Sequence, residues 1–179
     1  MGRSNRTQFI ILGLLAHDTL SGYEIKQEIA KSTAHFWAES DGQIYPALNQ
    51  LSEQGHIKCH ESATGARSRK RYSLTPSGHQ LLQEWLKKDV ERTMIRHELL
   101  LKLFFGGQTS KSVLLNHLER FQQDVEKKSE ALTAIAHSLK KTHANSKDLK
   151  YWLITLDYGI RIAHSQYEWC DVTKKTLLT

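Results

Sequence analysis

The sequence is poor in cysteine and proline. It holds two cysteines, Cys59 and Cys170, and two prolines, Pro46 and Pro76, among 179 residues. Two cysteines so far apart exclude a small secreted domain held by disulfides, and we expect reduced thiols in a cytosolic protein. The scarcity of proline argues against long irregular loops.

Long apolar runs are missing too. No run approaches the roughly 18 residues that a membrane-spanning helix needs, so we expect no membrane partner. The apolar run at residues 9–15 is too short for a secretory signal peptide, and an amphipathic helix is expected there instead.

Motifs of the common enzyme classes are also absent. The chain has no GxGxxG pattern, no glycine-rich phosphate loop, no nucleophile elbow and no carboxylate pair in a catalytic context. The best local set of metal-binding residue types is His56, Cys59 and His60. A strand turns residues 56 and 60 to one face and residue 59 to the other, so the three do not converge. We therefore expect no enzyme, no metal and no other cofactor.

Positive charge is what the chain has in excess. It carries 25 Lys and Arg against 19 Asp and Glu, a net charge of +6. This balance favours an acidic partner such as nucleic acid. The apolar share of 39% is that of a globular protein with a sizeable core.

Two helices are predicted at the start of the chain. The first covers the apolar residues 7–16. Ser21 and Glu24 have the spacing of a capping box, so Ser21 is expected to begin the second helix. Ile25 and Ile29 would form its buried face.

The stretch DGQIYPALNQLSEQGHI, residues 41–57, predicts the third helix. Pro46 lacks an N–H and costs little only in a first turn, so the helix must begin near Asp41 to Gln43. Gly55 would end it as a C-cap. Its buried face consists of Ile44, Ala47, Leu48 and Leu51.

The pattern changes after Gly55. Residues 56–62 alternate as a strand, residues 63–70 read as a cationic hairpin tip, and residues 71–75 form the returning strand. Thr75 then caps a further helix with Pro76 at its first position. A lone hairpin is unstable in water and must pack on the helices, so this order predicts a winged helix-turn-helix.

The second half is nearly all helix. A helix is predicted to end at Gly106-Gly107, and two longer ones cover residues 110–142 and 147–176. Apolar residues spaced by three and four, with a polar defect near residues 128–129, are typical of paired helices. Rods of this length cannot bury both faces against a 90-residue domain, so we infer a homodimer. The seam assigned to dimerisation consists of Leu114, Leu118, Phe121, Val125, Leu132, Ile135, Leu139, Leu153, Leu156 and Ile160.

The expected fold is thus mostly α with a small β-hairpin. Residues 1–90 would form a winged-helix DNA-binding domain, and residues 91–179 a helical dimerisation domain.

Three segments resemble the PadR family of bacterial transcriptional regulators. They are ILGLLAHDTLSGYEIKQEI, FWAESDGQIYPALNQLSEQGHI and RSRKRYSLTPSGHQLL, within residues 9–86. HELLLKLFFGG and the two long helices resemble the dimerisation region of the branch that includes virulence activators. The resemblance implies a dimeric winged-helix repressor or activator, often tuned by a small ligand. The wing departs from the family pattern because no proline separates its arginines.

The third helix is the expected reader of the bases. A recognition helix enters the major groove with its N-terminal end toward the bases. Gln43, Asn49 and Gln50 can donate and accept hydrogen bonds at a base edge. Tyr45 and Pro46 offer apolar contact, for example with a thymine methyl group.

The hairpin tip supplies cations. Arg67, Arg69 and Lys70 are expected to touch phosphate or to enter the minor groove. A strand cannot point four neighbouring cations one way, so Arg71 is expected to be structural. The plainer reading of the cluster is a solvated patch that keeps the protein soluble.

Tyr23 and Lys26 begin the second helix and are candidate phosphate partners, because the helix before a recognition helix crosses the DNA backbone. Tyr23 could equally pack on the domain. With two copies in a dimer, the expected target is a pseudo-palindromic operator in double-stranded DNA.

Two points stay open at the level of sequence. A helical protein-interaction module without direct DNA binding would explain the seam but leave the basic wing unused. A small-molecule effector could bind near Trp37, Trp152 and Trp169, although large aromatic residues at helical spacing more often form core.

Overall fold

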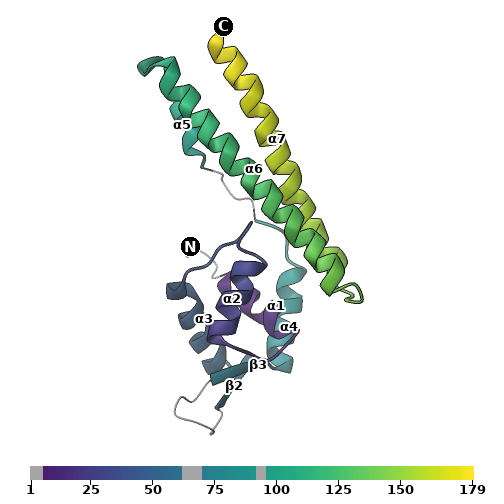
Figure 1. The fold of residues 1–179 in the computed structure, drawn as a ribbon. Helices are drawn as coiled ribbons and strands as arrows, with labels where there is room; N and C mark the ends of the chain where they lie inside the picture. Colours follow the sequence, from purple (N-terminus) through teal and green to yellow (C-terminus); the bar gives the residue numbers. More distant parts are fainter. Residues whose placement is uncertain (1–5, 62–69, 92–95) are drawn as a thin grey trace, which may run out of the picture. The chain divides into compact units, whose positions relative to one another are not determined.

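The computed structural model describes residues 6–61, 70–91 and 96–179 and confirms a mostly helical fold with a small sheet. The chain divides into two compact units, Met1–Arg92 and Thr93–Thr179. The first unit holds α1 (Thr7–Leu15), β1 (Leu20–Ser21), α2 (Gly22–Lys31), α3 (Asp41–Glu53), β2 (Ile57–Glu61), β3 (Lys70–Leu74) and α4 (Pro76–Leu86). The second holds α5 (Glu98–Phe104), the short 3-10 helix η1 (Gly106–Gln108), α6 (Lys111–Thr142) and α7 (Leu149–Leu178) (Figure 1).

The core of the first unit lies between its helices and the sheet. The predicted inner faces are confirmed, because Ile25 and Ile29 of α2 are buried together with all four apolar residues assigned to α3. Phe9 of α1 stacks on Trp85 of α4 with ring centroids 4.5 Å apart, which fastens the last helix of the unit to the first.

The sheet has three antiparallel strands in the order β1-β3-β2. The predicted hairpin is β2–β3, and its register pairs Cys59 with Tyr72. Strand β1 was not predicted, because two residues carry no detectable alternation. It pairs Leu20 with Tyr72 and Ser21 with Arg71, so the hairpin is joined to the start of α2.

The start of α4 is held tightly against the turn that joins α3 to β2. Thr75 caps α4 by accepting a hydrogen bond from the Gly78 N–H at 3.1 Å, and its hydroxyl lies 2.9 Å from the carbonyl oxygen of His56. A Cβ on Gly78 would lie 2.0 Å from that same oxygen. Glycine is therefore required at this close approach between backbones.

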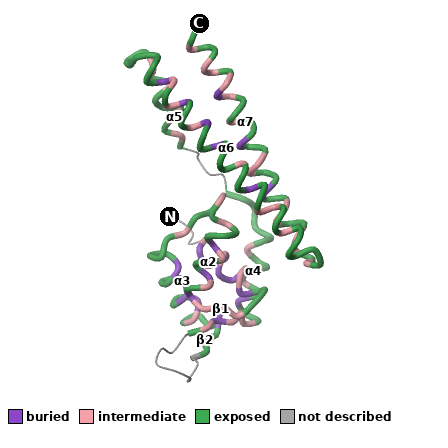
Figure 2. The backbone as a smooth tube through the Cα atoms, viewed as in Figure 1, coloured by how far each residue is buried: buried purple, intermediate pink, exposed green. Residues whose placement is uncertain are grey.

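The long helices α6 and α7 pack side by side as an antiparallel hairpin within one chain (Figure 1). Leu118 and Val125 of α6 are buried, as are Leu156, Ala163 and Cys170 of α7. Most of the remaining surface of both helices is exposed (Figure 2).

The seam assigned to dimerisation lies on these two helices, and its role at a dimer interface stays a prediction. Its buried members are covered within the single chain, where α6 and α7 pack together. The spacing showed that each helix is paired, but a heptad pattern does not name the partner. The buried members are Leu114, Leu118, Val125, Leu132 and Leu156, and the half-buried ones are Phe121, Ile135, Leu139, Leu153 and Ile160.

One buried polar group fixes how α6 and α7 align. Gln122 donates to the Tyr167 carbonyl at 3.2 Å and to the Asp171 carboxylate at 2.7 Å, and it accepts from the Lys174 ammonium group. The hydrogen bond from Gln122, with Lys174 nearby, lowers the pKa of Asp171. A sliding of one helix against the other would leave Gln122 buried without partners, so the network favours a single register.

Candidate nucleic-acid interface

Helix α3 begins where the sequence predicted. Ser40 and Gln43 form a capping box, in which the Gln43 side-chain oxygen accepts from the Ser40 N–H at 3.1 Å. Pro46 is the sixth residue of α3 and lies beyond the first turn, so the Gly42 carbonyl loses its helical donor. Gly42 is exposed, and water can satisfy that carbonyl.

The face of α3 opposite the core carries the candidate reading residues. Asn49 and Gln50 are exposed along the middle of the helix, and Gln43, Tyr45 and Pro46 are exposed nearer its start. The four buried apolar residues of α3 fix the rotation of the helix, so this face points away from the core.

Tyr45 is supported by the start of α2. A Cβ on Gly22 would lie 2.9 Å from Cε1 of the Tyr45 ring, so the missing side chain of Gly22 lets the ring lie against the helix end. Tyr45 still exposes 46% of its surface. The ring is thus braced from one side and open on the other.

Helix α2 places two candidate phosphate partners at its first turns. Its N-cap is the predicted capping box of Ser21 and Glu24. Tyr23 is largely exposed, and its hydroxyl accepts from the Gln27 amide at 2.8 Å. The Lys26 ammonium donates to the Asp41 carboxylate of α3 at 2.7 Å.

The wing is described only in its strands. Arg67 and Arg69 lie outside the described residues, and Lys70 is exposed at the start of β3. Arg71 has the structural role expected of it: its guanidinium pairs with Glu24 at 3.1 Å and donates to the Thr19 carbonyl. Hydrogen bonds from Ser21, together with Arg71, hold the pKa of Glu24 below its usual value.

The histidines of the hairpin bind hydroxyl groups. His56 lies 2.8 Å from the Ser77 hydroxyl, and His60 lies 2.7 Å from that of Ser73. In the described part of the chain, no three His, Cys, Asp or Glu residues gather as metal ligands. Among these same residues, no helix is long and apolar enough to cross a bilayer.

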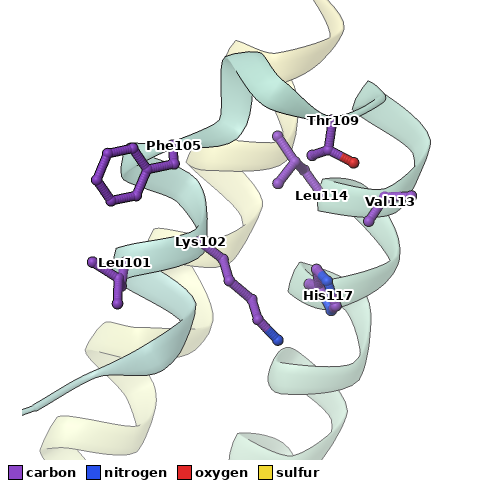
Figure 3. A pocket seen from close by; sticks show the side chains of 7 residues that line it. All are labelled: Leu101, Lys102, Phe105, Thr109, Val113, Leu114 and His117. Atoms are coloured by element: carbon purple, nitrogen blue, oxygen red, sulfur yellow. The ribbon is translucent and has the colours of Figure 1, made fainter.

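The second unit contains a cavity of about 350 Å³ between α5 and α6 (Figure 3). Lys102 in its lining pairs with Glu98 at 2.8 Å. Trp37, Trp152 and Trp169, which the sequence suggested for an effector site, are not among the residues that line this cavity. Trp37 donates a hydrogen bond to Glu39, and Trp169 contacts Phe121 edge to face. The lining residues are Leu101, Lys102, Phe105, Thr109, Val113, Leu114 and His117.

The sequence reading missed a second apolar stripe on α7. Tyr151, Ile154, Tyr158 and Ile162 follow one another at helical spacing and are exposed on the side opposite the residues buried against α6. A helical wheel of α7 shows this stripe, but the residues that pair α7 with another helix give the more regular spacing and are the ones assigned to dimerisation.

Two family models together match most of the chain. The model of the transcriptional regulator PadR-like family matches residues 11–84. The model of the virulence activator alpha C-terminal region matches residues 95–177.

Individual relatives match over most of the chain as well. The negative transcriptional regulator PadR of Bacillus subtilis (strain 168) is 29% identical over 147 residues, which are 80% of this chain and 79% of the relative. The structure of Bacillus subtilis PadR in complex with operator DNA matches with a TM-score of 0.83 at 26% identity, over 95% of this chain and 98% of the other.

Two further structures share the fold. Bacillus subtilis PadR in complex with p-coumaric acid has a TM-score of 0.72 at 26% identity, over 96% of this chain and 98% of the other. The Vibrio cholerae virulence activator AphA has a TM-score of 0.76 at 23% identity, over 96% and 97% of the two chains, and supports the fold alone. The chain belongs to the PadR-like family of transcriptional regulators, in the branch that carries the virulence-activator C-terminal region.

Proposed function

We propose that this regulator binds a pseudo-palindromic operator in double-stranded DNA as a homodimer. The observation that carries the proposal is the division of α3 into a fully buried apolar face and an exposed face of amide and aromatic side chains. The operator complex of Bacillus subtilis PadR, a relative of the same fold, supports it. DNA binding needs no catalytic group, so in this proposal the regulator is not an enzyme. We also propose that it works in the cytoplasm.

In this proposal α3 enters the major groove. Asn49 and Gln50 offer hydrogen bonds to base edges, and Gln43 offers its amide N–H groups because its oxygen is engaged by Ser40. Tyr45 and Pro46 supply apolar contact. Tyr45 is positioned for it by the close approach to Gly22 described above.

The remaining candidates hold the DNA backbone. Arg67, Arg69 and Lys70 of the wing would contact phosphate or the minor groove, and Tyr23 and Lys26 of α2 would contact phosphate. These contacts carry no sequence information, so they supply affinity and the base contacts of α3 supply preference.

Asn49→Ala is expected to reduce the preference for a cognate over a scrambled duplex by roughly tenfold, because a good base contact discriminates by about 1–3 kcal/mol. Arg69→Ala should instead weaken binding to both duplexes and flatten the slope of log K against log salt by about one unit. Fluorescence anisotropy with both duplexes over a salt series measures both quantities. The same loss of preference in the two variants would contradict the separation of roles.

A second copy of the chain is the expected cover for the exposed apolar surface of the second unit. Tyr158 and Ile154 of the α7 stripe expose 65% and 64% of their surface, and Phe104 at the end of α5 exposes 81%. Monomeric proteins rarely expose contiguous apolar patches of this kind. The ion pair of Asp157 with Arg161 at 2.8 Å places a negative and a positive charge beside the stripe. In a two-fold dimer the same surface of both copies meets, so each charge can face its opposite on the other copy.

A small-molecule effector is a weaker proposal. The p-coumaric acid complex of Bacillus subtilis PadR favours it, and the cavity between α5 and α6 is within the usual size of ligand sites. Four of the residues that line this cavity, Leu101, Phe105, Val113 and Leu114, are apolar, so a second copy of the chain is its simpler occupant.

A further inference from the structure

An ion pair joins the start of the reading helix to the helix before it. The Lys26 ammonium of α2 lies 2.7 Å from the Asp41 carboxylate of α3, and both side chains are about half exposed. The hydrogen bond and charge of Asp41 raise the pKa of Lys26. Exposed pairs of this kind contribute little to stability, so holding the fold together is a poor explanation for it.

The pair does matter for a phosphate group. Lys26 is one of the cations that the proposed function assigns to the DNA backbone, and in the free protein it already has an anionic partner. Asp41 is also the first residue of α3, where the free amide groups and the helix dipole favour an anion. Asp41 therefore engages the cation that an approaching phosphate would use, and it places a negative charge at the helix end that the phosphate would meet.

We propose that Asp41 is an internal competitor of DNA phosphate, which lowers the affinity of this regulator for every duplex by engaging Lys26. The proposal rests on α3 and α2 facing DNA as described above. On binding, Lys26 exchanges Asp41 for a phosphate, and the released carboxylate stays as a negative charge beside the DNA backbone. A regulator weakened in this way spends less time bound to nonspecific DNA, because phosphate contacts supply essentially all of the affinity there.

Asp41→Asn keeps the size of the side chain and the Ser40–Gln43 capping box and removes only the charge. We expect it to bind cognate and scrambled duplexes roughly three- to tenfold more tightly at low salt. The slope of log K against log salt should steepen by up to about one unit, because the released carboxylate no longer recruits a cation. Anisotropy titrations over a salt series measure both effects.

Glu53→Gln is the matched control. It makes the same change in net charge at the other end of α3, where Glu53 is exposed, and should leave affinity nearly unchanged. In a Lys26→Gln background, the gain from Asp41→Asn should shrink. Circular dichroism melts of each variant verify that the fold is kept.

The outcomes separate this inference from the proposed function. If the wild-type chain binds no duplex at low salt, the proposed function fails. If the wild type binds but Asp41→Asn binds equally or more weakly, Asp41 positions Lys26 rather than competing for it, and the inference is overturned. A gain confined to the cognate duplex, or an equal gain in Glu53→Gln, also overturns it, because phosphate charge is common to all DNA.

Discussion

The double variant Ile154→Glu/Tyr158→Glu is expected to be monomeric and to bind duplex DNA at least roughly 100-fold more weakly than the wild type. Both side chains lie in the middle of the exposed α7 stripe. Two carboxylates on each copy would have to be buried without partners if the patch met its own copy, which costs several kcal/mol. Sedimentation velocity measures the first effect and anisotropy the second.

The expected loss of DNA affinity in this variant follows from the loss of the physical connection between two DNA-binding units. In a dimer, binding of one α3 to its half-site makes the second binding event intramolecular, and this linkage contributes roughly 10²–10⁴ in affinity. A monomer keeps every contact of its own α3 but loses this gain. The double variant therefore tests the dimer through a property of the first unit, although both substitutions lie in the second.

The control for this variant is Gln123→Glu/His164→Glu. It adds two negative charges at exposed polar positions of α6 and α7, away from the stripe. It should remain dimeric and bind DNA almost as the wild type does. If Ile154→Glu/Tyr158→Glu stays dimeric as well, the stripe is not the interface.

Gly78→Ala is expected to lower the free energy of unfolding by about 3 kcal/mol, at the upper end of overpacking costs. The new Cβ would lie 2.0 Å from the His56 carbonyl oxygen, and backbone cannot move aside as a flexible side chain can. The Thr75 N–H and hydroxyl both bond to the same oxygen, so a shift there also disturbs the cap of α4. Urea unfolding followed by tryptophan fluorescence, to which Trp85 of α4 contributes, measures the change.

Gly13→Ala provides the opposite expectation. Gly13 lies inside α1, and a Cβ there meets no atom of the described residues within 4 Å. Alanine should therefore stabilise the chain by about 0.5–1 kcal/mol through its helix propensity. If Gly78→Ala lowers the free energy of unfolding by no more than Gly13→Ala raises it, the backbone at His56 moves aside at little cost and the expectation for Gly78 is contradicted.

The sequence predicted the first unit well because its signals are local. A capping box at Ser21, Thr75 followed by Pro76, and the spacing of the apolar residues in α3 each fix a boundary or a face within one turn or two. The identification of Arg71 as structural needed only the geometry of a strand. Its partner Glu24 lies 47 residues away, and no local pattern names such a contact.

The sequence predicted the second unit less fully because pairing is not local. A heptad seam shows that a helix has a neighbour, but intrachain and interchain neighbours leave the same spacing. In this chain α6 and α7 pack against each other, and the dimer surface that we propose is the exposed stripe of α7. Buried Gln122 looked like an ordinary polar residue, because its role depends on residues of the other helix.

The most direct test of the account is the stoichiometry of the complex with DNA. Genomic fragments recovered after crosslinking supply a cognate duplex, and sedimentation of protein–duplex mixtures gives the number of chains bound. We predict two chains per cognate duplex and at least roughly tenfold weaker binding to a scrambled one. One chain per duplex, or equal affinity for both sequences, would contradict the proposal of a homodimer that binds a specific DNA sequence.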